Sequence, residues 1–407
     1  MNNDNFNNFM IPIFSSNKDI VEQYLIQNGL NLDLTKSIQN IKYNNIPFGF
    51  FISISKNSNF IQVEELDHSL GLENIGATCY MNATLQCLCN INSLKSFFKE
   101  KNQSTNGINN GNPPLTKAFN EVITNLWKKS NLSYFTPTNF KNLISSLNPL
   151  FKGIQANDSK DLILFLYETL HNELNNLNTN NINLNNLNNL NIPNDLKIFR
   201  QDYYSQNNSI ISKTFFFEKN SNISCLTCNC INSSYNIINF LVFPLEKVRL
   251  YLANKKSGQF ENVTLEDCFE QNESQELLNG ENKIFCNNCH RMSDALSYNK
   301  LNTCPEVLTI ILNRGKGLEF DVRFTFPLKL YIRKFVKYIN CSASYELIGV
   351  ITHLGQNNMG GHFIAYCKSP VDKKWYCYND AFVNPIRDVE KEVNSKGIPY
   401  VLFYQRI

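Results

Sequence analysis

A cysteine in the first quarter of this sequence stands where a nucleophile is expected. Cys79 follows a glycine-containing turn, and Met81, Leu85 and Leu88 after it fall at the spacing of one helix face. The N-terminus of a helix stabilises a thiolate through its dipole and its unpaired N–H groups. Asn74 lies five residues upstream in the same turn, where its amide can join the Cys79 N–H in holding an oxyanion. For any single cysteine, a buried structural position at a helix start is the more frequent alternative.

A histidine late in the chain supplies a candidate base. Two strand-like runs within residues 360–380 predict an antiparallel hairpin with its turn centred on the Pro370–Val371 bond. His362 and Asn379 are equidistant from this bond, so they should face each other across the ladder. An Asn or Asp beside a histidine fixes its tautomer and directs it at a nucleophile. The two glycines before His362 keep the approach to its imidazole open. For His362 alone, a packed strand histidine is the alternative.

Two Cys-x-x-Cys pairs predict a metal centre. Each pair can wrap two thiolates around one tetrahedral zinc ion, and together they supply Cys225, Cys228, Cys286 and Cys289. The 57 residues between the pairs exceed a compact zinc ribbon, so the pairs should lie at the tips of neighbouring β-hairpins. Such an ion is structural, with four ligands and no open position. Cys230 and His290 lie beside the pairs as alternative ligands, and a redox role fits poorly because it needs one pair at a helix start.

Composition excludes several classes of protein. The chain has 407 residues, 43% of them hydrophobic and 18% charged, which suffices for a buried core. A net charge of +3 is far from the concentrated basicity that nucleic-acid binding needs. Without a signal peptide or an apolar run of bilayer length, we expect a soluble protein of the cytoplasm and nucleus that does not bind membranes. Its 13 cysteines are too sparse for a disulfide scaffold.

Helical and strand-like patterns occupy different parts of the chain. Apolar spacing predicts helices near residues 119–127 and 162–170, whereas β-rich runs predict strands at 212–217, 235–243, 307–312 and 345–352. This segregation predicts an α+β fold instead of alternating α/β. Residues 1–70 form an extension of unknown role, with a helix near residues 20–27 and a strand near 48–55. The Asn-rich stretch 172–194 has the composition of a solvated insertion.

The Cys79 segment resembles the cysteine box of the ubiquitin-specific proteases, and residues 360–380 resemble their histidine box. These papain-like cysteine peptidases cleave after the C-terminal glycine of ubiquitin. The resemblance covers residues 71–407, with its landmarks in family order. It implies that Cys79 is the nucleophile, that Asn74 is the oxyanion donor and that His362 is the general base. It further implies that Asn379 is the third triad member, that Asp380 assists as an acid and that Phe363 lines the narrow Gly-Gly channel.

Two further landmarks lie between these boxes. Residues 155–161 resemble the family's Gln-x-Asp-x-x-Glu helix, with Asp161 in place of Glu, and in the family that helix face receives the basic tail of ubiquitin. The resemblance therefore implies that Asp158 and Asp161 bind substrate, since arginine pairs well with carboxylates; an ordinary acidic helix start is the alternative. Residues 310–317 resemble the strand and loop written Leu-x-Arg-Phe, with Gly315 in place of the aromatic residue.

The resemblance also implies an architecture and an activity. A helical thumb at about 71–204, zinc-bearing β fingers at about 205–300 and a β-sheet palm at about 301–407 enclose a cleft between thumb and palm. The implied function is a monomeric deubiquitinating thiol peptidase that acts on ubiquitin and ubiquitinated proteins and holds one structural zinc ion. A peptidase for another ubiquitin-like modifier and a non-catalytic ubiquitin-binding scaffold are the alternatives.

Overall fold

The computed structural model describes residues 9–12, 51–54, 61–64, 68–103, 113–128, 131–175, 192–255, 262–315, 321–338, 342–355 and 361–407. The chain divides into two compact units. The first comprises residues 1–157 and 363–389, and the second comprises residues 158–362 and 390–407. The helix predicted near residues 20–27, most of the Asn-rich stretch and Gly360 lie outside the described residues. Among the described helices, none is long and apolar enough to cross a membrane.

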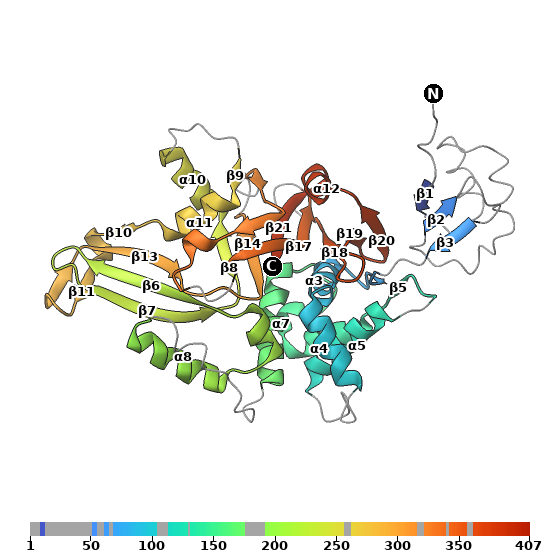
Figure 1. Cartoon of the computed structure of the whole chain (residues 1–407), viewed down its shortest axis with the longest axis horizontal. Helices are drawn as coiled ribbons and strands as arrows, with labels where there is room; N and C mark the ends of the chain where they lie inside the picture. Colours follow the sequence, from blue (N-terminus) through green and yellow to red (C-terminus); the bar gives the residue numbers. More distant parts are fainter. Residues whose placement is uncertain are drawn as a thin grey trace. The chain divides into compact units, whose positions relative to one another are not determined.

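A fully buried helix forms the centre of the first unit. This helix is α3 (Cys79–Cys89), and it packs against α4 (Asn92–Gln103), α5 (Pro114–Trp127) and strand β19 (Trp375–Asn379) (Figure 1). Helix α5 confirms the helix predicted near residues 119–127, because its buried residues recur at helical spacing. Pro114 suits the first position of α5, where its missing N–H has no partner to lose. Helix α6 (Thr138–Leu147) and the 3₁₀ turn η2 (Pro149–Phe151) follow.

Short strands complete the first unit. An antiparallel meander joins β18 (His362–Lys368), β19 and β20 (Phe382–Ile386), and the boundary between the units falls after the first residue of β18. Strand β4 (Gly71–Leu72) pairs in parallel with β5 (Tyr134–Phe135) just before the Cys79 turn. Strands β1 (Phe9–Pro12), β2 (Phe51–Ile54) and β3 (Ile61–Glu64) form a separate antiparallel sheet, in which β2 confirms the strand predicted near residues 48–55.

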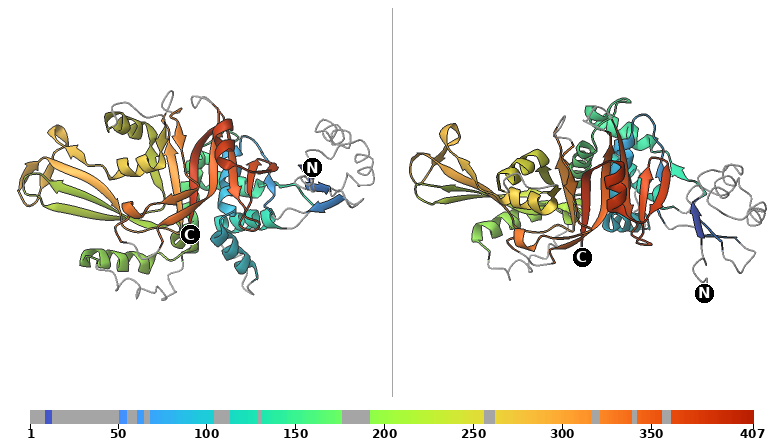
Figure 2. Two further views of the ribbon diagram at one scale, coloured as in Figure 1. Left: turned by 45° about the horizontal axis from the view of Figure 1, so that its top comes forward. Right: turned by 90° about the horizontal axis from the view of Figure 1, so that it is seen from above.

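A long antiparallel sheet projects from the second unit (Figure 2). Its order is β10-β13-β6-β7, with bounds β6 (Phe217–Cys225), β7 (Ile231–Ile238), β10 (Glu276–Leu278) and β13 (Ala295–Leu301). The 3₁₀ turn η4 (Gly280–Asn282) and the short hairpin β11 (Ile284–Cys286)–β12 (Arg291–Ser293) continue it at the far end. Helix α8 (Asn194–Gln206) packs along β7, where the Tyr235 hydroxyl donates to Asp195 over 3.0 Å. Near the base of the sheet, Arg200 and Glu218 form a bidentate ion pair, with both contacts at 2.7 Å.

A second sheet forms the core of this unit. Strand β21 (Ile398–Arg406) runs antiparallel between β17 (Ser344–Leu354) and β14 (Val307–Asn313). Strand β14 also pairs in parallel with β8 (Leu241–Pro244), and β17 also pairs antiparallel with β16 (Lys329–Tyr331). The ring of Tyr167, on α7 (Ser159–Leu174), stacks on Phe215 of α9 (Ile210–Phe215). The remaining elements are α10 (Leu245–Lys255), β9 (Val263–Thr264), α11 (Leu265–Glu273), β15 (Phe324–Thr325), η6 (Arg333–Phe335) and α12 (Val389–Lys396).

The predicted α+β class is confirmed, with two local corrections. Strands cover the predicted runs 307–312 and 345–352, whereas the run 235–243 is divided between β7, which ends at Ile238, and β8, which begins at Leu241 in another sheet. The strand predicted at 212–217 is wrong, because residues 210–215 form helix α9 and the strand begins only at Phe217. Ser209 and Ser212 close a reciprocal capping box, and this box satisfies the N–H groups that open α9.

Candidate active site and metal cluster

The turn before Cys79 has an unusual backbone. Gly76 and Ala77 both have positive φ angles, of 113° and 47°, and α3 begins at Cys79 as predicted. Asn74 organises this turn, because its Oδ1 accepts hydrogen bonds from the backbone N–H groups of Gly76 at 3.3 Å and Thr78 at 3.0 Å. The side chain of Asn74 is exposed, whereas that of Cys79 is only 5% exposed. The turn therefore places a helix-start sulfur and an exposed amide in one short segment.

Asp380 joins this segment from the turn after β19. Its Oδ2 accepts a hydrogen bond from Asn74 Nδ2 at 2.9 Å, and its Oδ1 accepts one from Asn82 Nδ2 at 2.8 Å. Its carbonyl accepts the Leu72 N–H at 2.9 Å, so the turn is also held by its backbone. The structure thus brings together Asn74 and Asp380, two of the predicted site residues. One Asn74 amide hydrogen is used in this way, and Nδ2 carries a second hydrogen.

Sequence reasoning missed Asn82. Its side chain lies one turn after Cys79 on the buried helix α3, where it connects the helix to Asp380. One signal in the sequence could have indicated its role: Asn82 is an amide side chain among apolar residues of a predicted helix. Asn is a poor helix former, so a buried Asn at such a position usually has a specific hydrogen-bond partner. That partner lies 298 residues away in the chain.

The predicted hairpin is present, but its register differs from the prediction. Strands β18 and β19 pair Ala365 with Tyr378 and Lys368 with Trp375, so continuing the ladder places Asn379 opposite Ile364. The prediction placed His362 there, two residues away. The turn is centred one residue later than predicted, and each residue of turn shift moves the register by two. A shift of two positions retains the face of the strand, since side chains alternate with a period of two.

His362 begins β18, directly after a glycine that a larger residue cannot replace. A Cβ on Gly361 would lie 2.3 Å from Cε1 and 2.4 Å from Nε2 of His353. The glycine is therefore required because the His353 ring packs against the backbone there. The open approach to the His362 imidazole stays a prediction. Burial lowers the pKa of His353, Asp158 raises it, and the charges of Arg314 and His362 lower it further. Two histidines thus lie within electrostatic reach of each other.

The two predicted substrate-binding carboxylates open helix α7. Asp158 is its N-cap, with a carboxylate that accepts the Lys160 N–H at 2.9 Å, and Asp161 lies in the first turn. Asp158 also accepts the Tyr400 hydroxyl hydrogen at 2.5 Å, a contact that the sequence did not reveal. Burial first, and then the charge of Asp158, raise the pKa of Asp161. The predicted acidic cluster exists, and part of it has a structural role in capping α7.

The segment resembling Leu-x-Arg-Phe ends β14 with a buried guanidinium. Arg314 donates from Nε to the Pro399 carbonyl at 2.9 Å and from Nη1 to the Val322 carbonyl at 2.8 Å. Burial lowers the pKa of this guanidinium to about 10, although Asp321 and Tyr400 oppose the shift. Gly315 follows with a φ of 64°, a conformation that an aromatic residue adopts only with strain. The chain therefore turns away at Gly315, and residues 316–320 lie outside the described residues.

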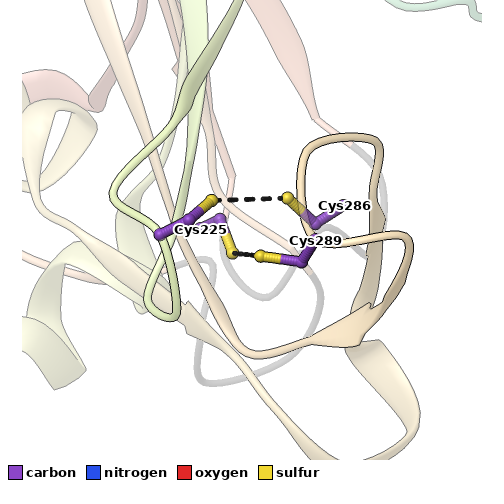
Figure 3. A group of neighbouring side chains, drawn as sticks. Cys225, Cys286 and Cys289 are labelled. Carbon is purple, nitrogen blue, oxygen red and sulfur yellow. Dashed lines mark hydrogen bonds between the residues drawn. The ribbon is translucent and has the colours of Figure 1, made fainter.

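Four cysteine sulfurs converge beyond the end of the long sheet. Figure 3 draws these side chains with their sulfurs turned toward one another, and Cys225, Cys286 and Cys289 are labelled. The sulfur of Cys225 lies 3.9 Å from that of Cys289, the sulfur of Cys228 lies 3.7 Å from that of Cys286, and all four lie within 4.8 Å of one another. Zinc–sulfur bonds of about 2.3 Å in a tetrahedron require sulfur separations of about 3.8 Å. The four cysteines can therefore hold one metal ion.

The two Cys-x-x-Cys segments share one backbone design. The residue after each second cysteine has a positive φ, 56° at Asn229 and 49° at His290, which folds each segment back on itself. The N–H of Cys228 donates to the sulfur of Cys225 and is the largest cause lowering the pKa of that thiol to about 6. Hydrogen bonding to Cys228 chiefly raises the pKa of the Cys289 thiol to about 12. His290 and Cys230, the alternative ligands, are exposed and lie outside the cluster of four.

The fold and this site define a class of protein. An α+β chain that presents a cysteine at a helix start beside an ordered asparagine, and that carries a four-cysteine cluster on a β arm, has the parts of a papain-like cysteine peptidase. The family model of ubiquitin carboxyl-terminal hydrolase matches residues 70–404. The chain belongs to this family, and its predicted resemblance to the ubiquitin-specific proteases is confirmed.

Curated relatives and a solved structure agree with this membership. Human ubiquitin carboxyl-terminal hydrolase 2 is 28% identical over 82% of this chain, and human ubiquitin carboxyl-terminal hydrolase 21 is 27% identical over 83%. This chain covers 54% and 61% of their respective lengths. In the structure of the yeast SAGA DUBm with an Sgf73 mutant, a 21% identical chain shares the fold, with a TM-score of 0.61 over 85% of this chain and 71% of that one.

Proposed function

We propose that this chain is a deubiquitinating thiol peptidase that hydrolyses the isopeptide or peptide bond after the C-terminal glycine of ubiquitin. The observation that carries the proposal is the Cys79 turn, in which Asn74, ordered by Asp380, stands beside a helix-start thiol. The family match over residues 70–404 supports the choice of substrate. Ubiquitin and ubiquitinated proteins are the proposed partners.

The proposed reaction assigns a role to each predicted residue. His362 takes the proton of Cys79, and the thiolate attacks the carbonyl carbon of the last glycine. The Cys79 N–H and the second amide hydrogen of Asn74 stabilise the oxyanion. His362, oriented by Asn379, then protonates the leaving amine, which releases the lysine and leaves a thioester on Cys79. Water, deprotonated by His362, attacks the thioester and releases ubiquitin with a free carboxylate.

Two further parts belong to the proposal. Asp158 and Asp161 would pair with the basic tail of ubiquitin, and Phe363 would narrow the channel around the Gly-Gly end. The acidic start of α7 supports the first assignment, since arginine forms strong charge-assisted hydrogen bonds with carboxylates. The four-cysteine cluster would hold a zinc ion with no open coordination position, so the ion would stabilise the β arm and take no part in the reaction.

Covalent capture tests the proposal. The purified chain is mixed with ubiquitin carrying a C-terminal electrophile and, in parallel, with probes of other ubiquitin-like modifiers, and each adduct is read by mass. We expect an adduct with ubiquitin that disappears in Cys79→Ala and persists in the matched control Cys230→Ala, whose thiol is exposed and lies outside the four-cysteine cluster. An adduct with another modifier alone would overturn the substrate, and no adduct with any probe would overturn the peptidase.

A further inference from the structure

One buried amide ties together three segments around the Cys79 turn. Asn82 lies on α3, one helical turn after Cys79, and is 2% exposed. Its Nδ2 lies 2.8 Å from Asp380 Oδ1 and 3.2 Å from each of the carbonyl oxygens of Leu72 and Glu73. The helix, the strand before the turn and the turn after β19 therefore meet at a single NH₂ group.

Helix stability alone does not account for this residue. Asn is among the weaker helix formers, and the Oδ1 of Asn82 is buried without a hydrogen bond. An apolar side chain of similar size would remove that unsatisfied acceptor, and the neighbours of Asn82 on the helix are predominantly apolar. Residues that reduce stability in this way are commonly kept because function needs them.

The contacts of Asn82 lead to the proposed oxyanion donor by two routes. The first route passes through Asp380: its Oδ1 accepts a hydrogen bond from Asn82 Nδ2, and its Oδ2 accepts one from Asn74 Nδ2. Both oxygens of the carboxylate are therefore hydrogen-bonded. Through the carbonyls of Leu72 and Glu73, it also holds the backbone directly before Asn74. Loss of the Asn82 amide therefore removes one hydrogen bond from this carboxylate and two from the backbone before Asn74, which weakens the restraints on the direction of the Asn74 amide.

We propose that Asn82 is a positioning residue that holds the Asn74 amide in the direction required to stabilise the oxyanion formed at Cys79. This inference rests on the proposed function. It predicts that Asn82 acts on turnover and leaves ubiquitin binding almost unchanged, because a donor aimed at a developing charge contributes in the transition state.

Asn90 provides a matched control on the same helix. It is the C-cap of α3, is 4% exposed, and donates to Ser69 Oγ at 3.1 Å and to the Gln86 carbonyl at 2.8 Å. Its Oδ1 is also buried without a hydrogen bond. Asn82→Leu and Asn90→Leu therefore remove similar buried amides, but only the first removes a contact to Asp380.

The experiment measures kcat and KM with ubiquitin bearing a C-terminal fluorogenic amide, together with thermal midpoints. We expect Asn82→Leu to lower kcat about 100-fold, the scale of losing one oxyanion donor, with KM changed by less than about threefold. Asn90→Leu should leave kcat within about threefold of the parent at a similar thermal midpoint. In the Asn74→Ala background, Asn82→Leu should lower kcat no further, because both changes remove the same interaction.

Three results would overturn the inference. They are an unchanged kcat in Asn82→Leu, an equal loss in Asn90→Leu, and full additivity with Asn74→Ala. If Asn82→Leu does not fold, the variants Asn82→Asp and Asp380→Asn are combined instead, since together they exchange the hydrogen-bond donor and acceptor. The double variant should be more active than Asn82→Asp alone. Equal activity of the two would count against the inference. An inactive parent chain would refute the proposed function itself, which separates the two failures.

Discussion

Replacing a single cysteine tests the proposed zinc site most directly. The change is Cys228→Ser, which removes one of four sulfurs whose separations of 3.7 Å and 3.9 Å bracket the value expected around zinc. Even an outer-shell partner of a metal ligand contributes about 10–100-fold to affinity. We therefore expect loss of a direct ligand to weaken zinc binding by at least about 100-fold.

The hairpin β11–β12 should reveal the structural consequence. Each of its strands has three residues, and the facing side chains of Phe285 and Met292 are both more than half exposed. A two-stranded hairpin without a buried face is marginal by itself. Without the ion, we expect faster amide hydrogen exchange and proteolytic cleavage within residues 280–294.

The assay combines zinc content by mass spectrometry, competition with a chelator, and hydrogen exchange across the hairpin. Cys230→Ser is the matched control, because this neighbouring cysteine is exposed and lies outside the cluster. The parent and Cys230→Ser should each hold one zinc ion per chain. A metal-free parent with a protected hairpin would refute the reasoning, and so would equal zinc affinity in Cys228→Ser and Cys230→Ser.

Three further predictions concern stability and the site. Glu218→Gln removes the bidentate partner of a buried Arg200 and should lower the free energy of unfolding by about 3–5 kcal/mol; a change below about 1 kcal/mol in denaturant titrations would contradict this. Asp161→Asn should stabilise the protein at pH 7, because a raised carboxyl pKa means that the charged form is disfavoured in the folded state. That gain should vanish in unfolding curves as pH falls through the folded pKa toward the unfolded value of about 3.9, and a gain that grows on acidification would exclude the explanation. Gly361→Ala should lower kcat/KM by about 100-fold, since a methyl group 2.3 Å from the His353 ring displaces the start of β18, and full activity in the fluorogenic assay would disprove this.

Local patterns in the sequence were sufficient for much of the site. The start of α3 at Cys79 and the two Cys-x-x-Cys segments follow from residues within a few positions of one another. The backbone of a short segment is set by its own turn residues and caps, so such features can be predicted without knowing the fold. The wrong strand at 212–217 shows the limit, because a capping box at Ser209 outweighed β-forming residues there.

Tertiary structure alone decided the remaining contacts. The register of β18 and β19 depends on where the turn is centred, and a one-residue difference moved it by two positions. The contacts of Asn82 with Asp380 and of Tyr400 with Asp158 join residues 298 and 242 positions apart. The spacing of residues in the sequence does not predict contacts between residues so far apart, because the partners meet only after the intervening chain has packed. The sequence by itself therefore determined the family and the candidate site residues, and the packed fold determined which side chains hold those residues in place.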